Sequence, residues 1–149
     1  MIHHISIAAE DPRRVASVLA ELWRGRAMPF PPVAVGSWVA LAGDDRNSLI
    51  EVYPFGSELH PAEGDADAAA VVNPQPSRFT ASHAAVASPL EEAEVFAIAQ
   101  REGWVAKYRK RGGLFGVIEL WLENRQMIEV LTAEMQREYL AAKPPGAPA

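Results

Sequence analysis

The chain opens on a short segment in which apolar and polar side chains alternate. In residues 4–9, Ile5 and Ile7 fall on one side of an extended backbone and His4 falls on the other. Successive side chains of a strand point to opposite faces, so period-two alternation predicts a strand with one face on a core. We therefore expect His4 to lie on the face that points away from that core.

A helix is predicted directly after this strand. Asp11 can cap free backbone amides, and Pro12 suits the first helical position because it has no N–H to leave unpaired. Apolar side chains then recur at helical spacing: Val15, Val18, Leu19, Leu22 and Trp23. This amphipathic helix can cover the apolar face of the first strand.

Three further strands complete the first half. The proline-rich segment 25–35 indicates an irregular connection around a short or edge strand, because proline cannot donate to a strand ladder. Residues 37–42 and 48–53 are two apolar runs separated by the turn-forming segment 43–47, which predicts a hairpin. Residues 1–56 are thus predicted to form a β-α-β-β-β module.

Residues 57–82 interrupt the pattern. The segment combines three prolines, several acidic residues and a run of alanines, a composition typical of a connecting loop. We interpret it as a long linker, either a solvated tether or a segment lying over a binding cleft.

The same order of elements recurs in residues 83–132. A strand over 83–87 is followed by a helix that we expect to be capped by Ser88, with Glu91 completing a capping box and Gly103 ending the helix. The remaining segments are predicted as strands over 104–110, 114–122 and 126–131, an amphipathic helix over 132–142, and a frayed tail over 143–149. The chain therefore reads as an α+β protein built from two β-α-β-β-β modules, with residues 133–149 as a C-terminal helix and tail.

The two modules also repeat their polar residues. Ile50-Glu51-Val52 in the last strand of the first module is echoed by Ile128-Glu129-Val130 in the second. A histidine opens the first strand of each module, His4 and His83, and the histidines and glutamates are displaced by nearly the same number of residues. Such an internal repeat supplies one imidazole and one carboxylate per module, a plausible set of ligands for a divalent metal.

Composition narrows the classes of function. A chain of 149 residues with 49% hydrophobic side chains can bury one substantial core. Its net charge of −5, with 14 basic and 19 acidic residues, disfavours nucleic acid and anionic membranes as partners, so a small molecule is the expected ligand. With no cysteine, only His, Asp and Glu can bind a metal. A basic segment followed by a long apolar run is lacking at the start, which leaves the cytoplasm as the expected location.

The two modules, with a histidine on the first strand and a glutamate on the last strand of each, resemble the vicinal oxygen chelate superfamily. This superfamily includes glyoxalase I, methylmalonyl-CoA epimerase, extradiol dioxygenases and resistance proteins against fosfomycin and bleomycin. The resemblance covers about residues 2–132 and implies a paired, cup-shaped mixed β-sheet. It further implies that His4, Glu51, His83 and Glu129 hold one metal ion and that the protein is a homodimer.

The resemblance also implies a type of chemistry. Imidazole and carboxylate ligands without sulfur suit Zn, Ni, Co, Fe or Mn with room left for a substrate. A substrate with vicinal oxygens could chelate such an ion, and Glu129 is implied as the base that moves a proton on the neighbouring carbon. The presence of Glu51 favours a glyoxalase-like lyase, isomerase or epimerase.

Alternatives remain open from the sequence. An iron-dependent ring-cleaving dioxygenase needs only the two histidines and the last glutamate, and a metal-free binding protein of the resistance type could use the same scaffold. A histidine on a strand is often structural, and a strand glutamate often just faces solvent. His3 replaces His4 as the candidate ligand if the first strand is shifted by one residue, because such a shift exchanges the two faces.

Overall fold

The computed structural model describes residues 2–31 and 34–142. The predicted tail over 143–149, and two positions of the predicted segment 25–35, lie outside this part of the chain. The chain divides into two compact units, Met1–Thr80 and Ala81–Ala149, which are described one at a time. Within the described ranges, no helix is long and apolar enough to cross a membrane.

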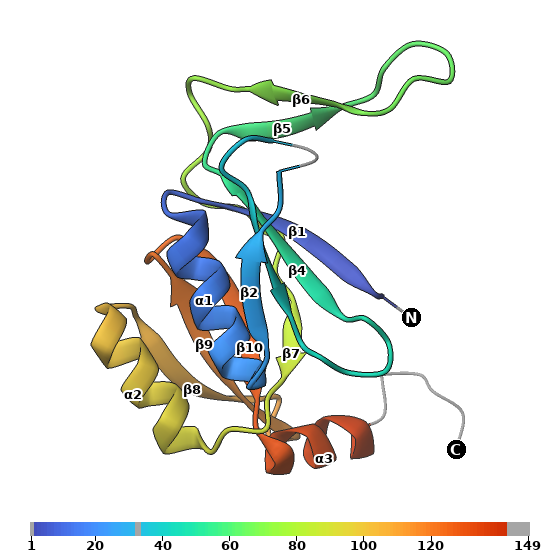
Figure 1. Ribbon diagram of the computed structural model, residues 1–149. Coiled ribbons are helices and arrows are strands. Elements are labelled where there is room, and N and C mark those ends of the chain that lie inside the picture. The colour runs from blue at the N-terminus through green and yellow to red at the C-terminus, as the bar shows by residue number, and fades with distance from the viewer. Residues whose placement is uncertain (1, 32–33, 143–149) are drawn as a thin grey trace. The chain divides into compact units, whose positions relative to one another are not determined.

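The first unit contains the predicted β-α-β-β-β module (Figure 1). Its elements are β1 (His4–Ala9), α1 (Pro12–Trp23), β2 (Arg26–Pro29), β3 (Trp38–Leu41) and β4 (Leu49–Pro54). The strands form one sheet in the order β1-β4-β3-β2. The first and last strands of the module, β1 and β4, are parallel neighbours, whereas the other pairs are antiparallel. This mixed sheet brings the two ends of the module side by side.

Helix α1 begins and ends as the sequence predicts. The Asp11 side chain accepts a hydrogen bond from the backbone N–H of Arg14 at 3.0 Å, and Pro12 occupies the first helical position. Arg24 ends the helix in the left-handed conformation with φ 53°. The next residue has to be glycine, because a Cβ at Gly25 would lie 2.0 Å from the carbonyl oxygen of Leu41. The helix is thus fixed at both ends on its own sheet.

The second unit repeats this arrangement. It consists of β7 (Ala85–Ala87), α2 (Glu92–Glu102), β8 (Ala106–Arg111), β9 (Phe115–Leu122), β10 (Gln126–Leu131) and α3 (Ala133–Ala141). The strand order is β7-β10-β9-β8, with β7 parallel to β10 and the remaining pairs antiparallel. The predicted α+β fold with two β-α-β-β-β modules is therefore confirmed, down to the bounds of the strand 126–131.

The N-terminus of α2 differs from the prediction. The helix is capped by Glu91 rather than Ser88, and the capping box joins Glu91 to Glu94. Ser88 instead accepts a hydrogen bond from the backbone N–H of Leu90 at 3.1 Å, three residues upstream of the first helical turn. The helix therefore starts three residues later than the Ser-x-x-Glu pattern predicts, because the carboxylates of Glu91 and Glu94 each accept a hydrogen bond from the other residue's backbone N–H.

Residues 57–82, expected as a linker, contain a two-stranded antiparallel sheet. Strand β5 (Ser57–His60) follows β4 after a short turn and pairs with β6 (Ala69–Val72). The turn requires Gly56, which has φ 89° and whose added Cβ would lie 2.8 Å from the Asn73 carbonyl oxygen. We call residues 57–72 the arm. Strands of four residues gave little sequence signal, and two of the four residues of β6 are alanines, which have little preference for strands.

Candidate functional site

The register of β1 and β4 brings the polar residues of the first unit together. Ser6 lies opposite Glu51 and His4 lies opposite Leu49 in this parallel pair. Because side chains alternate along both strands, His4, Ser6 and Glu51 share one face, while Ile50 is buried on the other. The predicted placement of His4 away from the core is confirmed, and His4 is exposed.

Glu51 is held by two hydroxyl groups. Its Oε2 accepts hydrogen bonds from Ser6 Oγ at 2.8 Å and from Tyr53 Oη at 2.5 Å. No described residue donates to Oε1, so this oxygen is available to a ligand. Burial raises the pKa of Tyr53 above 10.0, and the hydrogen bond to Glu51 raises it further. The phenol therefore stays protonated and keeps donating to the carboxylate at neutral pH.

The two adjacent histidines differ in their contacts. Nδ1 of His3 lies 3.2 Å from the backbone oxygen of Arg46, within hydrogen-bonding distance. The His4 ring has no hydrogen-bond partner among the described residues. Of the two, His4 has both ring nitrogens available and shares a face with Glu51, which agrees with the preference for His4 over His3.

The second unit repeats the register of the first. Ala85 lies opposite Glu129 on the parallel strands β7 and β10, as Ser6 lies opposite Glu51. His83 precedes Ala85 by two residues, and it lies just outside β7 rather than on a strand beginning at residue 83 as predicted. Its Nδ1 can donate to the Ala81 carbonyl oxygen at 3.1 Å. That contact leaves Nε2 as the nitrogen with a free lone pair, the arrangement usual for a metal ligand.

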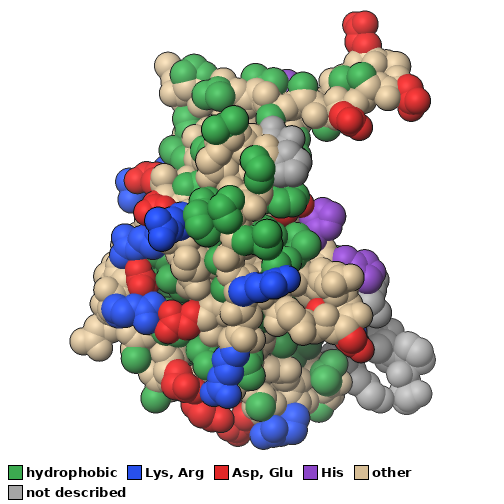
Figure 2. All heavy atoms as spheres, viewed as in Figure 1, with side chains coloured by type: hydrophobic (Ala, Val, Ile, Leu, Met, Phe, Trp, Pro, Cys, Tyr) green, Lys and Arg blue, Asp and Glu red, His purple; other side chains and the backbone are tan. Residues whose placement is uncertain are grey.

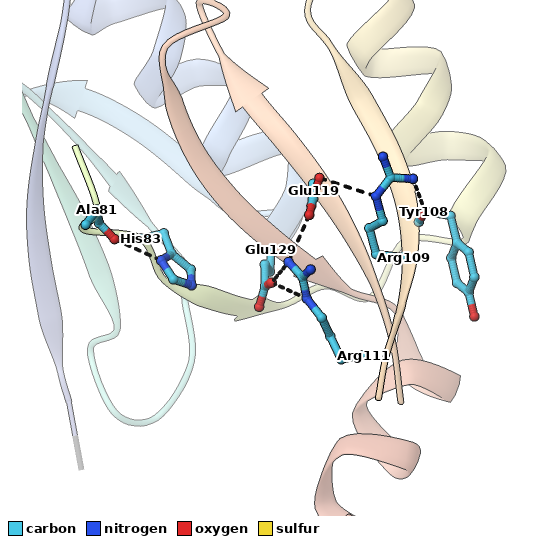
Figure 3. A network of polar contacts seen from close by, with 7 residues as sticks. All are labelled: Ala81, His83, Tyr108, Arg109, Arg111, Glu119 and Glu129. Carbon is cyan, nitrogen blue, oxygen red and sulfur yellow. Dashed lines mark hydrogen bonds and ion pairs between the residues drawn. The ribbon is translucent and has the colours of Figure 1, made fainter. Parts of the chain in front are cut away.

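Glu129 takes part in an ion-pair network that the sequence did not predict (Figure 3). Its Oε1 accepts hydrogen bonds from both Nε, at 3.0 Å, and Nη2 of Arg111 on β8. Arg111 Nη2 also donates to Glu119 at 2.9 Å, and Arg109 Nε lies 3.8 Å from Glu119. The hydrogen bond to Glu129 is the largest cause that raises the pKa of Arg111. As with Glu51, one carboxylate oxygen is held and the other has no partner among the described residues.

The surroundings of the two glutamates are thus different despite the shared register. Across the strand pair, Glu51 lies opposite the apolar Val39. Glu129 lies opposite Glu119, which in turn lies opposite Lys107 on β8. The only sequence signal for this difference was the run of basic residues in 107–111, most of which lies in the predicted strand 104–110.

The donor set of each unit fits half of a metal site. Each unit supplies one imidazole and one carboxylate: His4 lies on the strand parallel to that of Glu51, and His83 lies just before the strand parallel to that of Glu129. Both types of donor bind Zn, Ni, Co, Fe and Mn. Within either unit, the described residues include no group of three His, Asp or Glu side chains that could hold a metal ion. The register therefore places His4 and Glu51 on one face of the first unit, and it sets Glu129 beside the strand that follows His83 in the second.

Comparison with solved structures identifies the fold. No family model matches the chain, and no curated protein sequence matches it. Among solved structures, fosfomycin resistance protein FosX from Listeria monocytogenes is similar with a TM-score of 0.59 and 14% identity, over 95% of this chain and 96% of that one. Lactoylglutathione lyase from Agrobacterium tumefaciens gives a TM-score of 0.55 and 11% identity, over 90% and 94%. The chain has the vicinal oxygen chelate fold.

A third solved structure supports this assignment. Glyoxalase I from Leishmania major is similar with a TM-score of 0.51 and 15% identity, over 95% of this chain and 92% of that one. All three neighbours match over nearly their full length, so the similarity in fold covers both modules of this chain. Identities this low establish the fold, whereas activity has to be argued from the residues of the site.

Proposed function

We propose that this vicinal oxygen chelate protein is a metal-dependent enzyme that acts on a small substrate with two adjacent oxygens. In this proposal His4, Glu51, His83 and Glu129 hold one divalent ion, Zn, Ni, Co, Fe or Mn, and the active form is a homodimer. The observation that carries the proposal is the repeated register: each module sets its glutamate across a parallel pair from the residue two positions after its histidine.

The free atoms of the four side chains agree with a role as ligands. His4 and His83 each keep a ring nitrogen available. Glu51 and Glu129 each have one carboxylate oxygen without a hydrogen bond among the described residues. The other oxygen of each carboxylate is held by the protein, in Glu51 by two hydroxyls and in Glu129 by a guanidinium. These partners would fix the orientation of the two metal ligands without touching the metal. When bound, a divalent ion supplies Lewis acidity that favours loss of a proton beside a coordinated oxygen.

A similar protein provides a chemical precedent. The FosX protein of Listeria monocytogenes, in a variant form, has been solved with Mn(II) and a dihydroxypropylphosphonic acid. That ligand carries neighbouring oxygens, which is the kind of substrate that we propose for this chain. The proposed reaction is a glyoxalase-like isomerase, lyase or epimerase step, because this chain carries a glutamate in both modules.

We propose Glu129 as the base. In this role its Oε2 would accept the proton, since Arg111 holds Oε1 and keeps the side chain in one orientation. The competing assignment is Glu51, whose Oε1 is equally without a partner among the described residues. Substitution of each by glutamine separates the two, because the amide keeps the shape of the side chain but cannot take the proton.

Metal binding is tested on the purified full-length protein. Titration with MnCl2, NiCl2 or ZnCl2 in a calorimeter is expected to show one ion per pair of modules in the wild type. The variant His4→Gln should weaken binding at least tenfold, or about 1.4 kcal/mol, while the matched control His3→Gln should leave it unchanged. Equal binding by wild type and His4→Gln would remove the proposed site.

Turnover is tested by proton exchange. The metal-loaded protein is incubated in D2O with a panel of α-hydroxycarbonyl compounds, and loss of the carbon-bound proton is followed by NMR. We expect exchange to be lost in Glu129→Gln and metal to be retained. Exchange lost only in Glu51→Gln would transfer the role of base to Glu51. Oxygen consumption with a catechol after loading with Fe(II), and no proton exchange, would instead establish the ring-cleaving dioxygenase.

A further inference from the structure

The arm, residues 57–72, pairs only with itself. Strands β5 and β6 form a separate two-stranded sheet, and neither joins the four-stranded sheet of the first unit. Except for Ser57, every residue of the two strands is exposed. An isolated pair of four-residue strands is marginally stable in water and normally needs a further strand or a packed face. The arm would therefore be stabilised if another protein surface packed against it.

One face of the arm is apolar. Ser57 pairs with Val72 and Leu59 pairs with Ala70, so these four side chains lie on one face. Leu59 is 50% exposed and Val72 is 79% exposed. The opposite face carries Glu58 and His60, whose side chains contact each other at 2.9 Å. Alternation of this kind is typical of a sheet with one buried and one solvated face, and the apolar face is the one without a cover.

The charge of the arm indicates what kind of surface it fits. Residues 57–77 contain Glu58, Glu63, Asp65 and Asp67 and no Lys or Arg. The acids around the tip gather at the end of the projection in Figure 2. Strand β8 has four basic residues and no acid between residues 106 and 111. Three of them, Arg109, Lys110 and Arg111, already pair with glutamates of their own unit, which leaves the charge of Lys107. A negative projection and this lysine on the same chain are complementary between two copies of that chain.

Strand β8 is also free to receive a partner. It is the edge strand of its sheet and pairs only with β9, so its outer backbone groups have no strand beside them. Four of its six residues are exposed. Lys107 makes no ion pair among the described residues. Exposed Leu114, 60% exposed in the turn after β8, provides an apolar contact beside the charges.

We propose that the arm of one copy lies along strand β8 of a second copy. The apolar face with Leu59 and Val72 covers the edge of β8 beside Leu114, and the acids at the tip approach Lys107. This contact rests on the homodimer of the proposed function, but it does not depend on a metal or on the proposed reaction. It assigns residues 57–72 a role as an intermolecular contact, in place of a tether.

The contact is tested by measuring mass in solution with analytical ultracentrifugation over a range of protein concentrations. We expect the wild type to dimerise, and Leu59→Lys together with Val72→Lys to weaken the dimer at least tenfold. The matched control is Val71→Lys, which places the same charge on the opposite face of β6 and should leave the dimer intact. High salt should weaken the wild-type dimer, because the contact is partly ionic.

A charge exchange identifies the receiving strand. The variant Asp65→Lys with Asp67→Lys and the variant Lys107→Glu should each dimerise poorly, and an equimolar mixture should recover a mixed dimer. A wild type that stays monomeric overturns the proposal. A dimer that persists in the Leu59/Val72 variant overturns it as well, because the interface then lies elsewhere. Failure of the mixture to recover excludes β8 as the receiving surface.

Discussion

The link between Arg111 and Glu129 allows one prediction to be worked out in detail. The substitution Arg111→Met removes the guanidinium and keeps a side chain of similar length, so little packing is lost. Glu129 then keeps its carboxylate in a place where only 11% of the side chain is exposed, without the donor that holds Oε1. A buried charge deprived of its partner is destabilising because it has lost its hydration without compensation.

The expected magnitude follows from the exposure of the two partners. Removing one member of a fully buried ion pair costs about 3–5 kcal/mol. The Arg111 side chain is 38% exposed, so water can take over part of its role, and we expect a loss of about 1–3 kcal/mol in the free energy of unfolding. Glu119 loses one donor in the same variant but keeps Arg109 at 3.8 Å.

The assay is urea unfolding followed by tryptophan fluorescence. The matched control is Arg109→Met on the same strand, because Arg109 is 46% exposed, lies 3.8 Å from Glu119 and otherwise donates to the backbone oxygen of Tyr108. Its removal should change the free energy of unfolding by less than about 1 kcal/mol. Combining Arg111→Met with Glu129→Gln should cost less than the two changes added together, because no charge is left unpaired. Equal effects of Arg111→Met and Arg109→Met would refute the reasoning.

Two further predictions concern the first acid and the core. Burial and the hydrogen bond to Glu51 raise the pKa of Tyr53 above 10.0 in the folded protein. The folded state therefore holds the phenol proton more tightly than the unfolded state does. The resulting contribution to the free energy of unfolding is fully present below pH 10 and is lost as pH rises through the folded pKa. Glu51→Gln should therefore let Tyr53 ionise at lower pH, seen in the near-ultraviolet absorbance of tyrosinate with Tyr53→Phe as the control for assignment. Ile128→Ala should lower the free energy of unfolding in urea by about 2–5 kcal/mol, because Ile128 is 0% exposed. The control Leu114→Ala, at a residue that is 60% exposed, should change it by no more than about 0.5 kcal/mol. Equal losses in the two variants would argue against the burial of Ile128.

The parts of the fold that the sequence predicted well are those with strong periodicity or a specific cap. The strand 126–131 and the start of α1 after Asp11 were placed correctly, because apolar alternation and an N-cap before proline are local signals. The arm was missed because its strands have only four residues each. The cap of α2 was misplaced because Glu91 and Glu94 form a reciprocal capping box three residues after the expected cap at Ser88.

The candidate site was predictable to a different extent. The histidine and glutamate of each module could be found from the repeat, and their shared face followed from the alternation of side chains along a strand. The partners of the glutamates could not be found in the same way. Ser6 and Arg111 reach them from other strands, and the sequence does not state which strands are neighbours until the order of the sheet is known.

The way in which the two acids are supported has a consequence for how each can be disturbed. Tyr53 lies on the same interior strand as Glu51, and Ser6 lies on the parallel edge strand β1, so one of the two donors to the first carboxylate lies within its sheet. The second carboxylate relies on a side chain from the rim, since Arg111 is the last residue of the outermost strand. Local opening of that rim would release Glu129 while Glu51 stayed in place. A structural change at the end of β8 would thus affect Glu129 alone and leave the other half of the proposed metal site unchanged.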